Sequence, residues 1–245
     1  MPVGVTINAL SVLLGGIFGA LGGKHMSKNF KDGLNMVFGA CSMTMGIFSI
    51  APMKNMSAVI FAVIIGTGLG LAFQLGDKIN HAAKWMQQLI MKVFPKLNSL
   101  DSGMETAEFD ATLVTVIVLF CASGTGIYGA LTEGMNGDTS ILISKSILDF
   151  FTAAIFAANL GYVVSLIAVP QFIIFVLLFL FAGFIFPLTT PTMILDFKAV
   201  GGVLMLATGF RMVKLMMFPT ADMIPAMIVA LPLSWIWINW IGPLL

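Results

Sequence analysis

The sequence predicts an all-α fold, a polytopic membrane protein with about eight transmembrane helices. The chain of 245 residues is 59% hydrophobic and only 9% charged, and its mean hydropathy is +1.03. Soluble domains carry about 25% charged residues, so this chain has too few charges to cover the surface of a water-soluble globule. Its apolar residues also lie in runs of about 20, the length that crosses roughly 30 Å of hydrocarbon as a helix.

Eight such runs follow one another along the chain. They lie at 4–23, 33–51, 56–76, 109–131, 140–160, 162–186, 199–218 and 222–243, and together they form one transmembrane domain, 1–245. Backbone groups cannot stay unpaired in lipid, so runs of this length are expected to be helices. The first run is expected to be a retained helix rather than a signal peptide, because its positive charges follow it. Pro170, Pro225 and Pro232 are expected to kink the helices that contain them.

Lysine placement predicts the orientation of these helices. When the connections are numbered in chain order, the even ones hold Lys54 and Lys198, and the odd ones hold Lys24, Lys28, Lys31, Lys78, Lys84, Lys92 and Lys96. Positive residues stay in the cytoplasm, so the odd connections are expected there and both chain termini outside. We therefore expect a multi-pass protein of a bacterial cytoplasmic membrane.

The connection at 77–108 is long and is not expected to cross the membrane. Residues 77–97 place apolar side chains at three- and four-residue steps and lysines on the remaining faces. This pattern predicts an amphipathic helix lying in the membrane interface; the alternative is a connector that happens to be amphipathic. Residues 98–108 are expected to form a polar cytoplasmic loop.

Two parts of the sequence resemble each other. A shift of 167 residues aligns six identical residues of 30–56 with residues of 197–223, including Phe30-Lys31 with Phe197-Lys198. The matched helices run in opposite directions in the predicted topology, which indicates an inverted repeat of helices 1–3 against helices 6–8. Secondary transporters are often built this way. The alternative is that short apolar helices resemble one another by composition.

The fifth helix holds the strongest candidate site. Lys145 and Asp149 are four residues apart and share one helical face. At 1.5 Å per residue, Asp149 lies roughly 13 Å into the helix, near the middle of the membrane. Ionisable residues at that depth are expensive and usually functional, so this pair is expected to bind a solute or pass a proton. The alternative is a static pair that locks the helix.

Other polar residues in the membrane are weaker candidates. Asn8, Asn35 and Asn159 are amides that can line a polar path or bond a neighbouring helix. Arg211 and Lys214 share a face of the seventh helix, where they can attract an anion or extend toward the head groups.

Glycines provide a further candidate region. Gly15, Gly19 and Gly23 recur every four residues, as helices in close contact do. The segment 124–129 matches G-x-G-x-x-G, but it lies in a membrane helix without the preceding strand of a dinucleotide site. We therefore exclude a nucleotide, and expect Gly124 and Gly126 to loosen the fourth helix so that backbone carbonyls can face a solute.

The sequence offers no support for catalysis. Cys41 and Cys121 lie in apolar runs, and His25 and His81 lie in polar connections, so no metal spacing or catalytic triad is formed. We expect no cofactor and no enzymatic activity. With a net charge of +1, we also expect no nucleic-acid partner.

Several motifs resemble those of the YdfK/YqgA family of bacterial membrane proteins. They are Gly4-Val-Thr-Ile-Asn8 with Gly15-Gly16 and Gly19, Leu119-Phe-Cys121 with Gly124 and Gly129, Gly134-x-x-Gly137-Asp138, and Lys145-Ser-x-Leu-Asp149. The resemblance covers nearly the whole chain, and Ser123 and Thr125 depart from it. It implies a polytopic membrane fold and a function in the class of transport.

The sequence as a whole favours a secondary transporter or facilitator for a small polar or anionic solute. Its site is expected around Lys145 and Asp149, with Asn8, Asn35, Asn159 and the glycines at 124 and 126. The alternatives are an ion channel and a non-transporting membrane scaffold. Glycine-rich helix faces also predict a homodimer.

Overall fold

The computed structural model describes residues 1–22, 27–94 and 106–244, and every regular element in this part of the chain is helical. The all-α, membrane-type fold is therefore confirmed. In chain order the elements are α1 (Val3–Gly22), α2 (Lys28–Ile50), α3 (Met56–Ala72), α4 (Leu75–Val93), α5 (Thr106–Cys121), α6 (Gly124–Asn136), α7 (Ser140–Leu160), α8 (Val163–Leu166), α9 (Ala168–Ile185), α10 (Pro191–Met212) and α11 (Pro225–Ile236). Short turns η3 (Phe186–Leu188), η4 (Trp237–Ile241) and η5 (Gly242–Leu244) extend α9 and α11.

The number of possible membrane spans agrees with the prediction. Within the described residues, seven helical segments are long and apolar enough to cross a membrane, and the bent pair α3 and α4 makes up to eight. The pair bends by 59°, next to Gln74 in the left-handed conformation (φ 51°). Helix α4 covers most of the predicted amphipathic segment 77–97, and most of the predicted loop 98–108 lies outside the described residues.

Some predicted boundaries are wrong. The seventh span begins at Pro191 rather than 199, because the Thr190 hydroxyl caps the helix by accepting a hydrogen bond from Met193 N at 3.3 Å. Lys198 therefore lies within α10 and not in a connection. Pro225 occupies the first turn of α11, where proline is compatible with a helix, so it starts that helix instead of kinking it.

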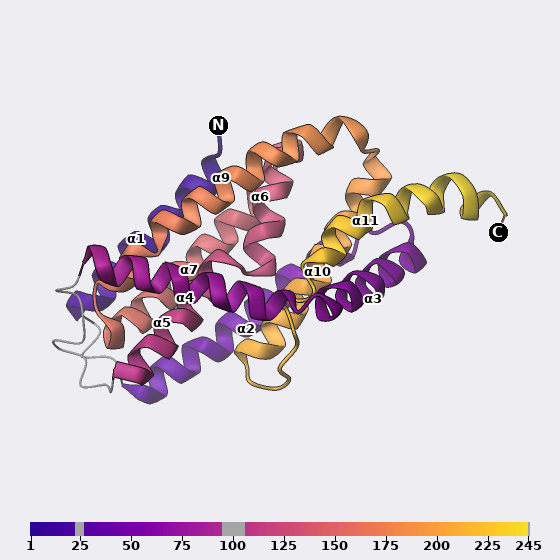
Figure 1. Ribbon diagram of the computed structural model, residues 1–245. Helices are drawn as coiled ribbons and strands as arrows, with labels where there is room; N and C mark the ends of the chain where they lie inside the picture. The colour runs from indigo at the N-terminus through magenta and orange to yellow at the C-terminus, as the bar shows by residue number, and fades with distance from the viewer. Residues whose placement is uncertain (23–26, 95–105, 245) are drawn as a thin grey trace.

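Close helix pairs build the molecule, and glycines make them possible. Helices α1 and α7 lie side by side in parallel, and α2 and α10 lie side by side in antiparallel (Figure 1). A Cβ atom on Gly19 would lie 2.1 Å from the carbonyl oxygen of Ala154, and one on Gly46 would lie 2.7 Å from that of Gly202. The contacts of Gly15 and Gly19 confirm that these glycines of α1 serve close packing, and Gly23 lies outside the described residues.

The helix directions suit a chain that crosses a membrane eight times. Helices α3 and α11 also pack antiparallel, with Gly66 against Ala226 and Gly70 against Asp222, and together they extend to one end of the molecule (Figure 1). Antiparallel pairing of α2 with α10 is what an inverted repeat requires, but any two neighbouring helices of opposite direction would pair in this way. The inverted repeat therefore stays a prediction.

Candidate functional site

A buried polar cluster connects α1, α7 and α9. Lys145 donates to Oδ2 of Asp149 on the same face of α7. The same oxygen accepts from Asn8 Nδ2 at 2.8 Å, and Asn8 Oδ1 accepts from Gln171 Nε2 at 2.9 Å. All four side chains are buried. The close approach of α1 at Gly15 and Gly19 places Asn8 within reach of the carboxylate.

The cluster is closed in this structure. The Lys145 ammonium lies 5.9 Å from the centre of the Phe120 ring, a cation–π distance that closes one side. Gln171 Oε1 is buried and has no hydrogen-bond partner, which is costly in an apolar interior. None of these four residues lines the cavities described next.

A cavity of about 390 Å³ with a mixed polar and apolar lining lies between α2, α4, α5, α7 and α10. Its polar lining comprises Asn35, Asn80, Thr115, Ser123, Thr152, Thr208, Arg211, Lys214 and Thr220. The lining has two cationic side chains and no carboxylate. Its apolar part includes Val118, Leu119 and Phe156. An amide- and hydroxyl-lined space with excess positive charge is suited to a small polar or anionic solute.

The cavity reaches the interruption between α5 and α6. Ser123 lines it and caps α6, its hydroxyl accepting from Gly126 N at 3.2 Å. The positive end of the α6 dipole therefore lies at the cavity wall. Thr152 lines the cavity from α7, three residues after Asp149. The cavity and the buried cluster are thus separated by about one helical turn, roughly 5 Å along α7.

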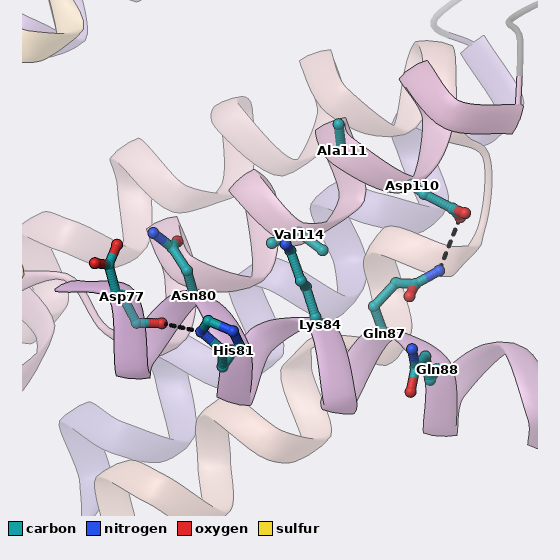
Figure 2. Close-up of a pocket in the computed structure, with 9 residues that line it drawn as sticks. All are labelled: Asp77, Asn80, His81, Lys84, Gln87, Gln88, Asp110, Ala111 and Val114. Carbon is teal, nitrogen blue, oxygen red and sulfur yellow. Dashed lines mark hydrogen bonds between the residues drawn. The ribbon is translucent and has the colours of Figure 1, made fainter. Parts of the chain in front are cut away.

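Two further pockets adjoin this cavity. One of about 250 Å³ shares Asn80, Arg211 and Ala221 with it. A wider one of about 550 Å³ lies between α4 and α5, and Asn80 lines it as well. Figure 2 shows the wider pocket, where Gln87 Nε2 donates to Asp110 Oδ1 at 2.8 Å. Asn80 lines all three spaces, so they adjoin one another at that residue.

The predicted site residues are only partly brought together. Asn35 lines the cavity, and Asn8 joins Lys145 and Asp149 in the buried cluster. Asn159 lies near the other end of α7, where its Oδ1 accepts from Lys31 at 3.1 Å.

The two glycines of the predicted site are packing positions here. A Cβ on Gly124 would lie 3.0 Å from Leu204, and one on Gly126 would lie 2.3 Å from the Phe175 ring. The fourth predicted span is interrupted next to these glycines, at Ala122 and Ser123 between α5 and α6. Those two residues line the cavity in place of the glycines.

Sequence reasoning missed most of the cavity wall. Thr115, Val118 and Leu119 of α5, with Ala122 directly after it, recur at three- and four-residue steps, so a face with one hydroxyl was visible in the sequence. Gln171 was also missed, although it is a rare polar residue in the most apolar span. Neither pattern by itself indicates which helices meet.

The described residues contain no group of three or more His, Cys, Asp or Glu side chains that could hold a metal ion. The cavity lining likewise includes no cysteine or histidine. The cavity lining offers hydrogen bonds and positive charge for binding.

Comparisons with known proteins place this architecture in a family. The chain is 44% identical over 240 residues to "Uncharacterized protein YqgA" of Escherichia coli (strain K12), covering 98% of this chain and 99% of that protein. It is 24% identical over 226 residues to "Uncharacterized membrane protein YdfK" of Bacillus subtilis (strain 168), covering 92% and 93%. No solved structure matches. Residues 3–235 match the family described as "Protein of unknown function (DUF554)", and the chain belongs to that family.

Proposed function

We propose that this protein is a secondary transporter or facilitator that moves a small polar or anionic solute across the bacterial cytoplasmic membrane. The observation that carries the proposal is the cavity at the interruption between α5 and α6, with amide, hydroxyl and cationic side chains in its lining. The cavity gathers amide, hydroxyl and cationic side chains from several apolar helices, which is the lining that a solute site needs and that helix packing alone does not require. Discontinuous helices beside a solute site are also a recurring construction of secondary transporters.

The buried cluster has a second role in this proposal. Lys145, Asp149 and Asn8 lie about one turn beyond Thr152, on the closed side of the cavity. A shift of α7 against α5 would connect the cavity with the cluster, so that the solute or a proton reaches Asp149 only in a second state. The unpaired Gln171 Oε1 supports such a second arrangement, because it lacks a partner in this one.

The test is solute and proton flux into proteoliposomes that contain the purified protein. Asp149→Asn and Lys145→Ala are expected to abolish flux, since each removes one half of the ion pair. Asp32→Asn removes a carboxylate from an exposed position of α2 and is the matched control, with flux expected to be unchanged. If both cluster variants fold and transport like the parent, the cluster has no part in transport.

The same assay separates the two alternatives. Flux that does not saturate, with single-channel currents in planar bilayers, would identify an ion channel. Absence of flux for every solute, together with tolerance of cluster substitutions apart from lower stability, would identify a scaffold. We also propose that the transporting unit is a homodimer, because glycine-rich helix faces favour helix association.

A further inference from the structure

The cavity contains the sole arginine of the sequence, Arg211. Every other cationic side chain in the chain, apart from the two histidines, is a lysine. Arg211 lies in the last turn of α10, where it lines both the cavity and the smaller adjoining pocket. A planar guanidinium binds the two oxygens of a carboxylate or phosphate side by side, which an ammonium does not do.

The charge of Arg211 is not neutralised by a salt bridge within the described residues. Its Nη1 donates to Thr220 Oγ1 at 2.7 Å. The ion pairs in this part of the chain join Lys145 to Asp149 and Lys198 to Asp138. Asp222 lines the smaller pocket with Arg211, but its Oδ1 accepts from Gly76 N at 2.8 Å, at the start of α4. Among the residues that the structure describes, Arg211 therefore faces the cavity as a partly buried cation whose hydrogen-bond partner is a hydroxyl.

The rest of the lining supplies further hydrogen-bond donors. The Ser123 and Thr220 hydroxyls each accept a hydrogen bond, from Gly126 N and from Arg211, so their own hydrogens are left to donate. The Lys214 ammonium adds a second positive charge. No carboxylate lines this cavity, although Asp77 and Asp222 line the smaller pocket beside Arg211, so an anion in the cavity itself meets two positive charges and hydrogen-bond donors.

The geometry points to a small oxyanion, such as a carboxylate, as the solute of this cavity, with Arg211 as its principal binding residue. This inference rests on the proposed function, because it names the substrate class for the same cavity. Binding is nevertheless measurable without transport, so the two ideas can fail separately.

A single arginine permits a direct test on the wild-type protein. Phenylglyoxal modifies arginine side chains much faster than amino groups, so intact-protein mass spectrometry of the protein in nanodiscs would report chiefly the modification of Arg211. Acetate, succinate and inorganic phosphate are titrated to saturation at constant ionic strength, against sodium chloride and against neutral glycerol. At about ten times its Kd, an oxyanion is expected to slow modification about tenfold, because only the free site reacts. Arg211→Lys is the control that shows no modification.

Variants provide a second measurement that does not depend on the reagent. The wild-type protein is expected to unfold at a higher temperature in the oxyanion that protects it best, and Arg211→Gln is expected to lose that increase. Lys92→Gln removes an exposed positive charge at the end of α4, far from this cavity lining, and is expected to keep the increase in unfolding temperature. Thr220→Val removes one donor and is expected to reduce the increase.

The outcomes are separable. No modification of Arg211, equal protection by glycerol and oxyanions, or an unchanged thermal increase in Arg211→Gln would each overturn the oxyanion assignment. Protection by an oxyanion with no flux of that oxyanion would retain the assignment and overturn transport. Flux of a neutral solute without oxyanion protection would retain transport and overturn the assignment.

Discussion

At the scale of the residue, the most consequential feature is the buried ion pair of Lys145 and Asp149. Asp149 is 7% exposed and Lys145 is 4% exposed, yet each has a charged partner, and Asn8 adds a hydrogen bond to the carboxylate. Removing one partner of a buried pair typically costs about 3–5 kcal/mol, because the other charge is left uncompensated. Folding controls are therefore essential whenever a cluster variant loses flux.

Asp138, which lies outside the membrane-spanning segments, is expected to make the stability of the protein depend on pH. Burial raises the pKa of its carboxyl, but hydrogen bonds from Lys198 and Ser140 together with the Lys198 charge outweigh burial, so the pKa is lowered overall. The carboxylate accepts from Lys198 Nζ at 2.9 Å and from Ser140 N at 3.1 Å. Because the folded pKa is the lower one, this stabilisation is complete above the unfolded value of about 3.9 and is lost as pH falls through the folded pKa.

The measurement is thermal unfolding of the parent and of Asp138→Asn between about pH 3 and 6. The parent is expected to be more stable at the upper end, and the difference is expected to shrink as pH falls below the usual range of an aspartate. A difference that stays constant over this range would show that Lys198 and Ser140 do not favour the ionised form.

At the scale of the element, carboxylates of one helix twice cap the N-terminus of a neighbouring helix. Asp196 of α10 accepts from Lys54 N and Asn55 N, both at 2.9 Å, at the start of α3. Glu133 of α6 accepts from Gly4 N at 2.8 Å and Val5 N at 3.0 Å in α1. Each negative charge lies at the positive end of a helix dipole and satisfies backbone donors that have no partner in their own helix.

Asp196→Ala is expected to destabilise the protein by about 1–3 kcal/mol, because two partly buried backbone donors and the buried Ser234 hydroxyl lose their acceptor. Unfolding in detergent measures the loss, and hydrogen exchange should rise at Lys54 and Asn55. Asp196→Asn keeps one acceptor oxygen, so its stability is expected to lie between that of Asp196→Ala and that of the parent. Equal stability of Asp196→Ala and the parent would show that water replaces the carboxylate at this helix start.

Gly19 tests the packing of α1 against α7. In Gly19→Ala the new methyl group would lie 2.1 Å from the Ala154 carbonyl oxygen, so the two helices must separate. We expect lower thermal stability, with loss of flux as Asn8 moves away from Asp149. Gly33→Ala is the matched control, because no atom lies within 4 Å of its Cβ position and alanine is the better helix former. Equal behaviour of the two variants would contradict tight packing.

At the scale of the whole molecule, the distribution of lysines predicts how the protein is oriented in the membrane. With both termini outside, the lysine-rich α4 faces the cytoplasm and the turn between α6 and α7 faces outward. Single cysteines placed at Gln88 and at Asn136, with Cys41 and Cys121 replaced by serine, are labelled in intact cells by a membrane-impermeant maleimide. The cysteine at 136 is expected to react and that at 88 to react only after lysis. The reverse labelling pattern would show that the orientation in the membrane is opposite to the predicted one.

The sequence alone determined the helical membrane architecture and the Lys145–Asp149 pair. Hydrophobic run length and i,i+4 spacing are local properties, which a chain keeps whatever its neighbours do. Interruption of the fourth span near Gly124 was predictable for the same reason, since small residues and Ser123 mark it locally.

Only the tertiary structure decided which polar residues share a space. Thr152, Arg211 and Ser123 come from three helices far apart in sequence, and helix crossings set by buried glycines bring them to one cavity. The same packing buries Asp149 behind the cavity wall and gives Asn159, at the end of α7, Lys31 as its hydrogen-bond partner. A periodic pattern tells which face of a helix is polar, but the partner of that face depends on long-range packing that no local pattern encodes.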